Sequence, residues 1–371
     1  MLIGIDASRA VMSERTGTEN YSLFLIRALL NLDTAHRFRL YTSQEPASDL
    51  LPEDERVELR VMPFPRLWTH LRLSWEMLRH PPDVLFVPAH VLPFIHPKSV
   101  ATVHDLGYLH HASAHRRLAR WYLGWGTRFT ARQAKALVVD SRSTRTDLAE
   151  HYHVARSHIH VIYPAGAEGI APVTDGDALA AVAERHKTGD SYVLSLGTIQ
   201  PRKNLITLID AFSLAHRTGA LAEGTRLVLA GRLGWLSDDI VARAAAPDVL
   251  DLVVMPGYVP QKDVPALMSG ASAFVFPSLY EGFGLPVLEA MACGTPVGCS
   301  KSSSLPEVAG SAAYMVEPLD VAGWAEALKH LTANEALRTE LVQRGFRQAA
   351  EFTWERCAAQ VLEVIESVGR M

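Results

Sequence analysis

The sequence predicts an α/β protein with two Rossmann-like domains, each a parallel sheet with helices on both faces. A chain of 371 residues is too long for one ordinary hydrophobic core and comfortable for two. Short apolar runs that end in polar residues alternate with helical patterns, as in parallel sheets. This alternation lapses around residues 168–190 and then starts again. We therefore expect one domain over 1–170 and a second over 171–352.

The individual strands follow from these apolar runs. Those in the first half span residues 1–7, 37–43, 57–63, 83–89, 99–105, 136–141 and 158–164. Those in the second half span residues 192–198, 225–231, 251–257, 273–278, 296–300 and 312–318. In such sheets ligands bind beyond the carboxyl ends of the strands, so we expect a site in the cleft between the domains. A final helix begins after Thr353, a natural N-cap.

The amino-acid composition limits the partners and the compartment that the sequence suggests. The net charge of −4 gives no reason to expect nucleic acid as a partner. Residues 1–170 hold 20 Lys and Arg against 17 Asp and Glu, and 13 of the 16 histidines, so this half is expected to face something anionic. The three cysteines have no metal-site spacing and indicate a reducing compartment. Without a signal-peptide pattern or an apolar run of about 18–20 residues, a cytoplasmic protein is expected.

The stretch YEGFGLPVLE places a glycine-rich turn between a predicted strand and a helix. Backbone N–H groups of Phe283, Gly284 and Leu285 would point out of the helix start, where the helix dipole favours anions. Glu281 would lie on the turn, and Glu289 would lie in about the first turn of the helix and accept hydrogen bonds from a sugar hydroxyl. The alternative is an ordinary turn with two solvated glutamates.

Another strand ends at Gly197 and is followed by PRKN and a helix. Arg202 and Lys203 could clamp a diphosphate there, Arg through its planar fork and Lys as a point charge. A solvated basic turn is the alternative. Two further glycine-containing strand exits, AGRLGW and PGYVPQ, could line a nucleoside pocket or be simple turns.

The first half offers two weaker candidates. Gly17 precedes a predicted helix and would allow a phosphate or sugar to approach the backbone closely. His104 ends a predicted strand and could provide a polar contact or act as an acid–base group. A packed or solvated histidine is the alternative for His104.

Together, PRKN, GYVP and FPSLYEGFGLPVLEAMACGTPVG…SSSLPEVAG closely resemble the retaining nucleotide-sugar glycosyltransferases of family 4, which have the GT-B fold. The resemblance covers nearly the whole chain and is strongest over 190–310. Glu281 and Glu289 match the family's Glu-x7-Glu signature. The terminal helix resembles the family segment that crosses back to the first domain, so the resemblance implies that 353–371 belong with residues 1–170.

The resemblance also implies roles for the candidate residues, four of which would be catalytic: Glu281, His104, Arg202 and Lys203. It assigns Arg202 and Lys203 to the donor diphosphate, Glu289 to the donor ribose and Val259 to the donor base. Glu281 and His104 would contact the transferred sugar, and the amides of Phe283, Gly284 and Leu285 would contact the hydroxyls of that sugar or the phosphates. Gly17 would lie near the diphosphate and the acceptor. Two positions depart from the family. Thr16 stands where relatives often have a second glycine, and Thr198 stands where many have a basic residue.

The implied activity is retaining transfer of a hexose, with mannose favoured, from a GDP- or UDP-sugar to a glycan or lipid-linked acceptor in polysaccharide biosynthesis. No cofactor and no metal are expected, because the one Asp-x-Asp, Asp175 to Asp177, lies in the predicted linker. A non-catalytic protein that binds sugar nucleotides or polysaccharide remains an alternative. An NAD-dependent oxidoreductase is disfavoured, because no complete G-x-G-x-x-G follows a strand.

Two segments, 66–80 and 116–135, combine aromatic and basic residues. In the first, Trp68, Leu71, Trp75 and Leu78 recur at helical spacing among arginines, and the second repeats this theme with two tryptophans. Core packing of these stripes is the favoured interpretation. Peripheral contact with the inner face of a membrane is kept as a hypothesis, because basic aromatic helices can lie on anionic bilayers.

Overall fold

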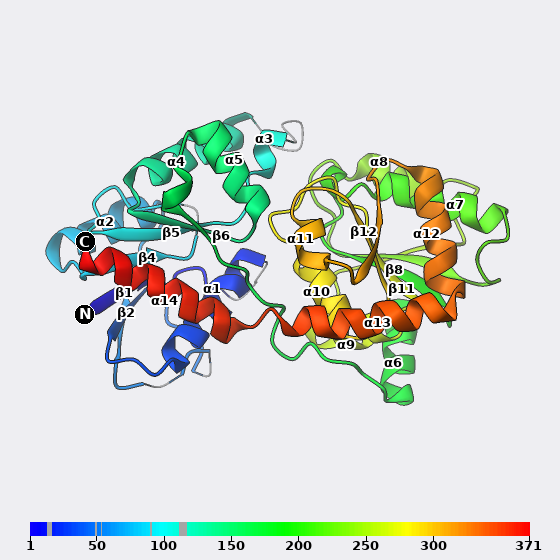
Figure 1. The fold of residues 1–371 in the computed structure, drawn as a ribbon, viewed down its shortest axis with the longest axis horizontal. Helices are drawn as coiled ribbons and strands as arrows, with labels where there is room; N and C mark the ends of the chain where they lie inside the picture. The colour runs from blue at the N-terminus through cyan, green and yellow to red at the C-terminus, as the bar shows by residue number, and fades with distance from the viewer. Residues whose placement is uncertain (13–16, 49, 53, 90, 111–116) are drawn as a thin grey trace. The chain divides into compact units, whose positions relative to one another are not determined.

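A computed structural model describes residues 1–12, 17–48, 50–52, 54–89, 91–110 and 117–371. The described chain forms two compact units (Figure 1). The first unit holds residues 1–106, 117–165 and 352–371, and the second holds 107–110 and 166–351.

The first unit is built on a seven-stranded sheet in the order β3-β2-β1-β4-β5-β6-β7. Every neighbouring pair is parallel. The strands are β1 Leu2–Asp6, β2 Arg37–Thr42, β3 Val57–Val61, β4 Val84–Val87, β5 Ser99–Val103, β6 Ala136–Val139 and β7 Ile159–Val161. Its helices are α1 Gly17–Asn31, the π-helix η1 Thr69–Leu73, α2 Ser74–Arg79, α4 Arg117–Gln133, α5 Arg142–Tyr152, the short η3 Arg156–His158 and α14 Trp354–Arg370.

The second unit is built on a six-stranded parallel sheet in the order β10-β9-β8-β11-β12-β13. The strands are β8 Tyr192–Leu196, β9 Arg226–Ala230, β10 Val253–Gly257, β11 Ala273–Phe276, β12 Val297–Ser300 and β13 Ala313–Val316. Its α-helices are α3 Gly107–His110, α6 Gly176–His186, α7 Leu205–Arg217, α8 Asp238–Ala244, α9 Val264–Ser269, α10 Leu285–Ala292, α11 Leu305–Ala309, α12 Val321–Ala333 and α13 Glu335–Ala350. Two 3-10 turns, η4 Pro201–Lys203 and η5 Gln261–Asp263, complete it. The predicted α/β class with two parallel sheets is confirmed.

The C-terminal helix α14 packs within the first unit. Its N-cap is Thr353, whose hydroxyl accepts from the Arg356 N–H at 3.2 Å, as predicted. Its buried face, which includes Val361 and Ile365, shares one hydrophobic core with α1, β1 and β4. Apolar burial of this kind is the main stabilisation of a helix that has one polar face.

The favoured interpretation of residues 66–80 as core is wrong for most of the stripe. Trp68 is buried and its indole N–H donates to the Met62 carbonyl at 2.7 Å. The other three members of the stripe are about half exposed: Leu71 at 48%, Trp75 at 52% and Leu78 at 58%. Helical spacing predicts an apolar stripe, but spacing does not tell whether another element covers its members.

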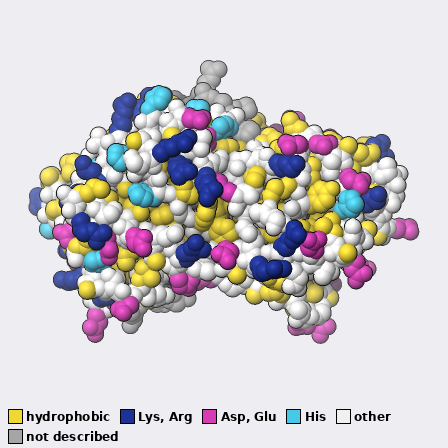
Figure 2. Space-filling model, in the orientation of Figure 1, with side chains coloured by type: hydrophobic (Ala, Val, Ile, Leu, Met, Phe, Trp, Pro, Cys, Tyr) yellow, Lys and Arg dark blue, Asp and Glu magenta, His cyan; other side chains and the backbone are white. Residues whose placement is uncertain are grey.

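In the segment 116–135, the two tryptophans are also exposed to solvent. On α4, Trp121 is 69% and Trp125 36% exposed. Arg116 and the side chains of residues 117–120 lie outside the described part. On the face drawn in Figure 2, histidine side chains (cyan) gather over the first unit, as their distribution in the sequence requires.

Three strand exits of the second unit lie against one another. The Gly197 N–H donates to the Ala230 carbonyl at 2.9 Å, and the Gly231 N–H donates to the Gly257 carbonyl at 2.8 Å. Gly231 has φ +144°, and a Cβ there would stand 1.9 Å from the Gly197 oxygen. Only glycine fits this approach, which brings the ends of β8, β9 and β10 together.

Replacing Gly231 by alanine should therefore lower the free energy of unfolding by about 3 kcal/mol or more, because strain at positive φ adds to a clash with backbone. Gly224→Ala is the matched control, since Gly224 also has positive φ (+77°) but open space around it. That control should cost only about 1 kcal/mol. Urea unfolding of both variants measures the difference, and equal losses would contradict the packing described.

Candidate functional site

The strongest candidates follow β8 and β11, the two central strands of the second sheet. From this pair the strand order runs outward in opposite directions, through β9 to β10 and through β12 to β13. Such a reversal leaves a crevice beyond the carboxyl ends of the two strands, where open α/β sheets bind ligands. Arg202 and Lys203 follow β8, and Glu281 follows β11.

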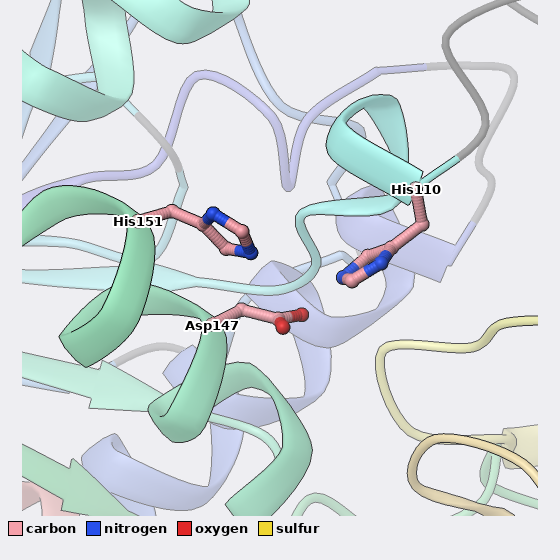
Figure 3. A group of neighbouring side chains, drawn as sticks. All are labelled: His110, Asp147 and His151. Atoms are coloured by element: carbon pink, nitrogen blue, oxygen red, sulfur yellow. The ribbon is translucent and has the colours of Figure 1, made fainter.

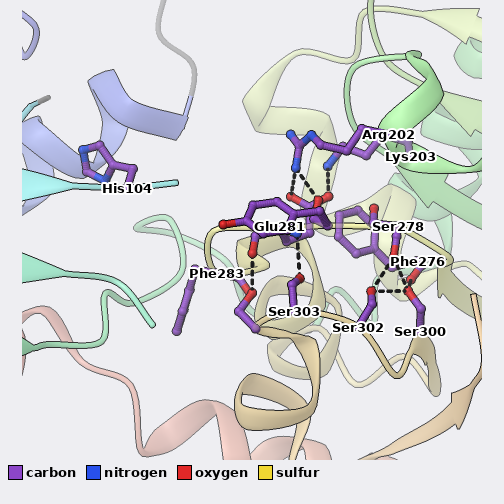
Figure 4. A network of polar contacts seen from close by, with 12 residues as sticks. His104, Arg202, Lys203, Phe276, Ser278, Glu281, Phe283, Ser300, Ser302 and Ser303 are labelled. Carbon is purple, nitrogen blue, oxygen red and sulfur yellow. Dashed lines mark hydrogen bonds and ion pairs between the residues drawn. The ribbon is translucent and has the colours of Figure 1, made fainter. Parts of the chain in front are cut away.

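These three side chains form one buried ion cluster (Figure 4). The Glu281 carboxylate accepts from Lys203 Nζ at 2.8 Å through Oε1 and lies 2.8 Å from Arg202 Nη1 through Oε2. Only 9% of the Glu281 side chain is exposed, 11% of Lys203 and 19% of Arg202. The alternatives of a solvated basic turn and a solvated Glu281 are therefore wrong.

The cluster is electrostatically dominated by its cations. Burial alone would raise the pKa of Glu281, but the charges of Arg202 and Lys203 outweigh burial and hold that pKa at about 2. The carboxylate is thus ionised throughout the physiological range. One carboxylate faces two cations, so the cluster carries a net positive charge.

Two further contacts fix the cations. The Lys203 ammonium lies 4.4 Å above the centre of the Phe276 ring, a cation–π geometry. Gly197, which has φ +149°, lies in contact range of the lysine, since a Cβ at that position would stand 3.4 Å from Lys203 Cε. On the other cation, Arg202 Nη1 also donates to the Tyr280 carbonyl at 2.6 Å. Both side chains are therefore held at the strand ends.

Asn204, a residue that sequence reasoning overlooked, shapes the turn that carries the two cations. It has φ +55°, which asparagine tolerates better than most residues, and it directly precedes α7. Its amide donates to the carbonyls of Pro277 at 3.1 Å and Pro318 at 2.6 Å. Asparagine at the end of PRKN thus ties the β8 turn to the exit of β11.

A set of serines after β12 holds the glycine-rich turn. The Ser303 hydroxyl accepts from the Glu281 N–H at 2.7 Å. The Ser304 hydroxyl contacts two carbonyls of the turn, Glu281 at 3.0 Å and Phe283 at 2.6 Å. Ser302 donates to the Ser278 carbonyl at 2.7 Å (Figure 4). Sequence reasoning gave these serines no role, although a polar run directly after a strand was a usable signal.

The turn leads into α10 at Gly284, which has φ +116° and no side-chain cap. A Cβ at Gly284 would stand 2.7 Å from Leu305 Cδ2, so glycine is required. Pro286 lies in the first turn of α10 and Gly294 follows its end with φ +75°, which suit a helix start and a helix end. The helix start beside Leu285 therefore offers backbone donors close to Glu281.

Glu289 is the fifth residue of α10, so it lies in the second turn and not the first. Its Oε1 accepts from the Ala167 N–H at 3.3 Å. Burial raises the pKa of this carboxyl, opposed by the hydrogen bond from Ala167. No cation among the described residues shifts the pKa of Glu289, so this carboxyl is electrostatically unlike Glu281 and suited to hydrogen bonding.

The remaining candidate of the second unit, Val259, is buried two residues after β10. Beside it, the Arg232 guanidinium lies 4.5 Å above the Tyr258 ring. Gly17 and His104 belong to the first unit. Gly17 begins α1, and a Cβ there would have no neighbour within 4 Å. Thr16 lies outside the described residues.

His104 directly follows β5 and is only 13% exposed in its side chain. Its Nδ1 lies 2.7 Å from Asp140 Oδ2 and its Nε2 lies 3.0 Å from the Pro88 carbonyl oxygen. Asp140 is a residue that sequence reasoning overlooked, although it ends a predicted strand as His104 does.

Three acidic and histidine side chains outside the candidate site lie on helices: Asp175 at the start of α6, and Asp147 and His151 on α5. The Asp175 side chain accepts from the Asp177 N–H at 3.1 Å and caps α6, so the Asp-x-Asp marks a helix start. On α5, Asp147 and His151 lie one turn apart (Figure 3).

Comparison with known proteins identifies the family. Residues 15–165 match the family model described as Glycosyltransferase Family 4, and residues 180–348 match the model described as Glycosyl transferases group 1. This protein is a family 4 glycosyltransferase. The O-antigen chain mannosyltransferase B of Escherichia coli is 27% identical to the glycosyltransferase over 96% of this chain and 98% of its own.

Other relatives match only part of the chain in sequence, or share its fold at low sequence identity. The serotype-specific mannosyltransferase WbdA of E. coli is 32% identical over 62% of the chain, which spans only 28% of that protein. The structure of HepE from Anabaena in complex with UDP-glucose superposes with a TM-score of 0.77 at 16% identity, over 99% of both chains. Sucrose-phosphate synthase from Thermosynechococcus elongatus gives 0.75 at 19% identity over 99% of this chain and 98% of its own. The GT-B fold of the glycosyltransferase is thereby confirmed.

No helix among the described residues of the glycosyltransferase has both the length and the apolar character needed to cross a bilayer.

Glu281→Gln should lower the free energy of unfolding by about 3 kcal/mol at pH 7, because it leaves two buried cations without their carboxylate. The folded-state pKa of Glu281 is depressed, so its contribution is complete above the ordinary value of 4.5 and is lost as the pH falls through about 2. The stability gap between the wild type and Glu281→Gln should therefore shrink below pH 4.5.

Urea midpoints at pH 7 and pH 3 measure this gap. Glu326→Gln is the control, since Glu326 is 54% exposed in its side chain and pairs only at the surface. A gap for Glu281→Gln that is independent of pH would contradict the ion cluster.

Proposed function

We propose that the glycosyltransferase retains anomeric configuration and transfers a hexose, with mannose favoured, from a nucleoside-diphosphate sugar to a glycan or lipid-linked acceptor without a metal ion. The observation that carries this proposal is the net positive ion cluster of Arg202, Lys203 and Glu281 beside the uncapped start of α10. A leaving diphosphate needs fixed positive potential, and preorganised donors supply it without reorganisation.

The proposed division of work follows from charge. Arg202, Lys203 and the backbone donors near Leu285 take the diphosphate charge. Glu281 offsets the repulsion between the two cations and lies near the transferred sugar, while Glu289 accepts from the donor ribose. The Asp-x-Asp gives no support for a metal-bound diphosphate, since Asp175 caps a helix.

In the proposed reaction, the bond between the anomeric carbon and the diphosphate oxygen breaks while a bond to the acceptor oxygen forms on the same face. The acceptor proton passes to the leaving phosphate. This route needs no enzyme nucleophile, in contrast to the carboxylate pairs of retaining glycosidases. The ion cluster is suited to it, because Glu281 is committed to two cations.

Mannose is favoured because two relatives are named mannosyltransferases. A nucleoside diphosphate as the donor's leaving part is supported by the HepE structures, which hold UDP and UDP-glucose. A thermal-shift screen with GDP, UDP and ADP selects the base. Donor hydrolysis with GDP-mannose, UDP-glucose and UDP-N-acetylglucosamine then separates a transferase from a non-catalytic binding protein, since only the former releases nucleotide slowly without metal.

Lys203→Ala should lower kcat for donor hydrolysis by about 100-fold, because it removes charge stabilisation of the leaving phosphate. Glu289→Ala should mainly raise the Kd for donor by about tenfold, through loss of a charged hydrogen bond. Lys329→Ala, a surface lysine on α12 that is 53% exposed in its side chain, is the control and should change neither. Wild-type kinetics in both site variants would overturn these assignments.

We further propose peripheral contact of the first unit with the inner, anionic face of a membrane. The supporting observation is the exposure of Trp75, Leu78 and Trp121, which contrasts with their favoured interpretation as core. The Arg79 guanidinium lies 4.5 Å above the Trp75 ring, so a cation accompanies the apolar surface. Amphipathic surfaces with tryptophan and arginine suit anionic interfaces.

The double variant Trp75→Ala, Trp121→Ala should bind liposomes with anionic lipid about tenfold or more weakly, since each exposed tryptophan contributes about 1 kcal/mol on insertion. Trp235→Ala is the control, because Trp235 is 44% exposed but lies in the second unit. Co-sedimentation at low salt is the measurement. Absence of wild-type binding there would exclude the proposed contact.

A further inference from the structure

His104 joins the ends of three adjacent strands in the first sheet. Pro88 directly follows β4, His104 follows β5 and Asp140 follows β6, and these strands are neighbours in the sheet. The imidazole contacts a residue at the end of each neighbouring strand: Nε2 lies 3.0 Å from the Pro88 oxygen and Nδ1 lies 2.7 Å from Asp140 Oδ2. Its orientation is therefore fixed from both sides.

The two partners dictate where the protons lie. A carbonyl oxygen only accepts hydrogen bonds, so Nε2 must carry a proton to bond to Pro88. A separation of 2.7 Å between Nδ1 and Oδ2 also requires a proton, because two lone pairs would repel each other. With Asp140 ionised, the ring donates from both nitrogens and is an imidazolium.

The surroundings favour this ionised pair. Burial would lower the pKa of His104, but the negative charge and hydrogen bond of Asp140, with smaller effects of Pro88 and Asp105, raise it overall. Burial raises the pKa of Asp140, and His104 opposes that rise. The other Asp140 oxygen, Oδ1, is buried without a hydrogen-bond partner among the described residues, so His104 is the group that compensates this carboxylate.

Two other titratable groups near the pair, Tyr21 and Cys357, are uncharged at neutral pH. Tyr21 of α1 meets the His104 ring edge-on, with centroids 4.5 Å apart, and burial raises its pKa well above the ordinary value. Burial likewise raises the pKa of the Cys357 thiol on α14. Of the described groups, Asp105 and Asp140 therefore supply the charges that act on the ring.

We propose that Asp140 is the positioning residue of His104, which it holds as a fixed two-donor cation, so that His104 does not shuttle protons in the transfer reaction. The role of His104 in transfer rests on the proposed function, whereas its protonation and orientation do not. His104 would thus present the reacting sugar with a ring of constant charge and direction. A neutral ring keeps only one N–H, so an acid–base cycle would cost the hydrogen bond to Pro88 or the one to Asp140 at each turnover.

Side-chain NMR of the full-length protein tests the protonation directly, with His104→Gln to assign the ring signals. Wild-type His104 should show both nitrogens protonated at pH 7. In Asp140→Asn, which keeps the size but removes the charge, the pKa of His104 should fall by about one unit or more. Asp147→Asn is the matched control, because Asp147 is another buried carboxylate of the first unit, and it should leave His104 unchanged.

Ordinary titration of His104 in the wild type near 6.5 would overturn the proposal, even if Asp140→Asn fails to fold. An unchanged His104 pKa in a folded Asp140→Asn would do the same. The free energy of unfolding gives a second measurement. Because the folded-state pKa of His104 is raised, its stabilising contribution is complete below pH 6.5 and is lost as the pH rises through the folded-state pKa. This loss should move to lower pH in Asp140→Asn.

The pH dependence of kcat for donor hydrolysis provides a kinetic test. In Asp140→Asn the alkaline limb of the kcat profile should move to lower pH, with activity near wild type well below that limb. A uniform loss of kcat at every pH would indicate a merely structural role for Asp140 and overturn the proposal. If no donor is hydrolysed by the wild type, the proposed function fails while the NMR result still stands.

Discussion

Two cations and one carboxylate, nearly removed from water at the ends of two central strands, are the interaction on which the second unit's site depends. Burying charges is costly unless they are paired and hydrogen-bonded, and here Glu281 pairs with both Arg202 and Lys203. The arrangement leaves one positive charge uncompensated by Glu281. It therefore combines a stable fold with an attraction for anions.

The neighbouring features serve to hold that cluster in place. Asn204 bends the chain that carries the cations and bonds across to the exit of β11. Serines that follow β12 bond to the backbone on both sides of Glu281. Each of these elements comes from a different strand exit, so the parallel sheet is what brings them together.

The sequence predicted the strands and the motif positions well, because buried parallel strands are short apolar runs and because glycine, proline and polar residues mark their exits. It placed Arg202 and Lys203 at the correct strand end but could not reveal that Glu281 pairs with both. The Lys203–Glu281 contact joins residues 78 positions apart in the chain. Likewise, Trp68 and Trp75 look equivalent by spacing, yet one is buried and the other half exposed, because coverage by other elements leaves no local signature. Asp140 was overlooked for a related reason: its partner, His104, follows a different strand.

We propose that the cations paired with Glu281 receive the donor diphosphate. A crystal structure of the glycosyltransferase with a bound nucleoside diphosphate tests it most directly. Phosphate oxygens are expected within about 3 Å of Lys203 Nζ and the Arg202 guanidinium, with Glu281 still in contact with at least one of the two cations. A diphosphate bound elsewhere, with both cations still paired with Glu281, would contradict it.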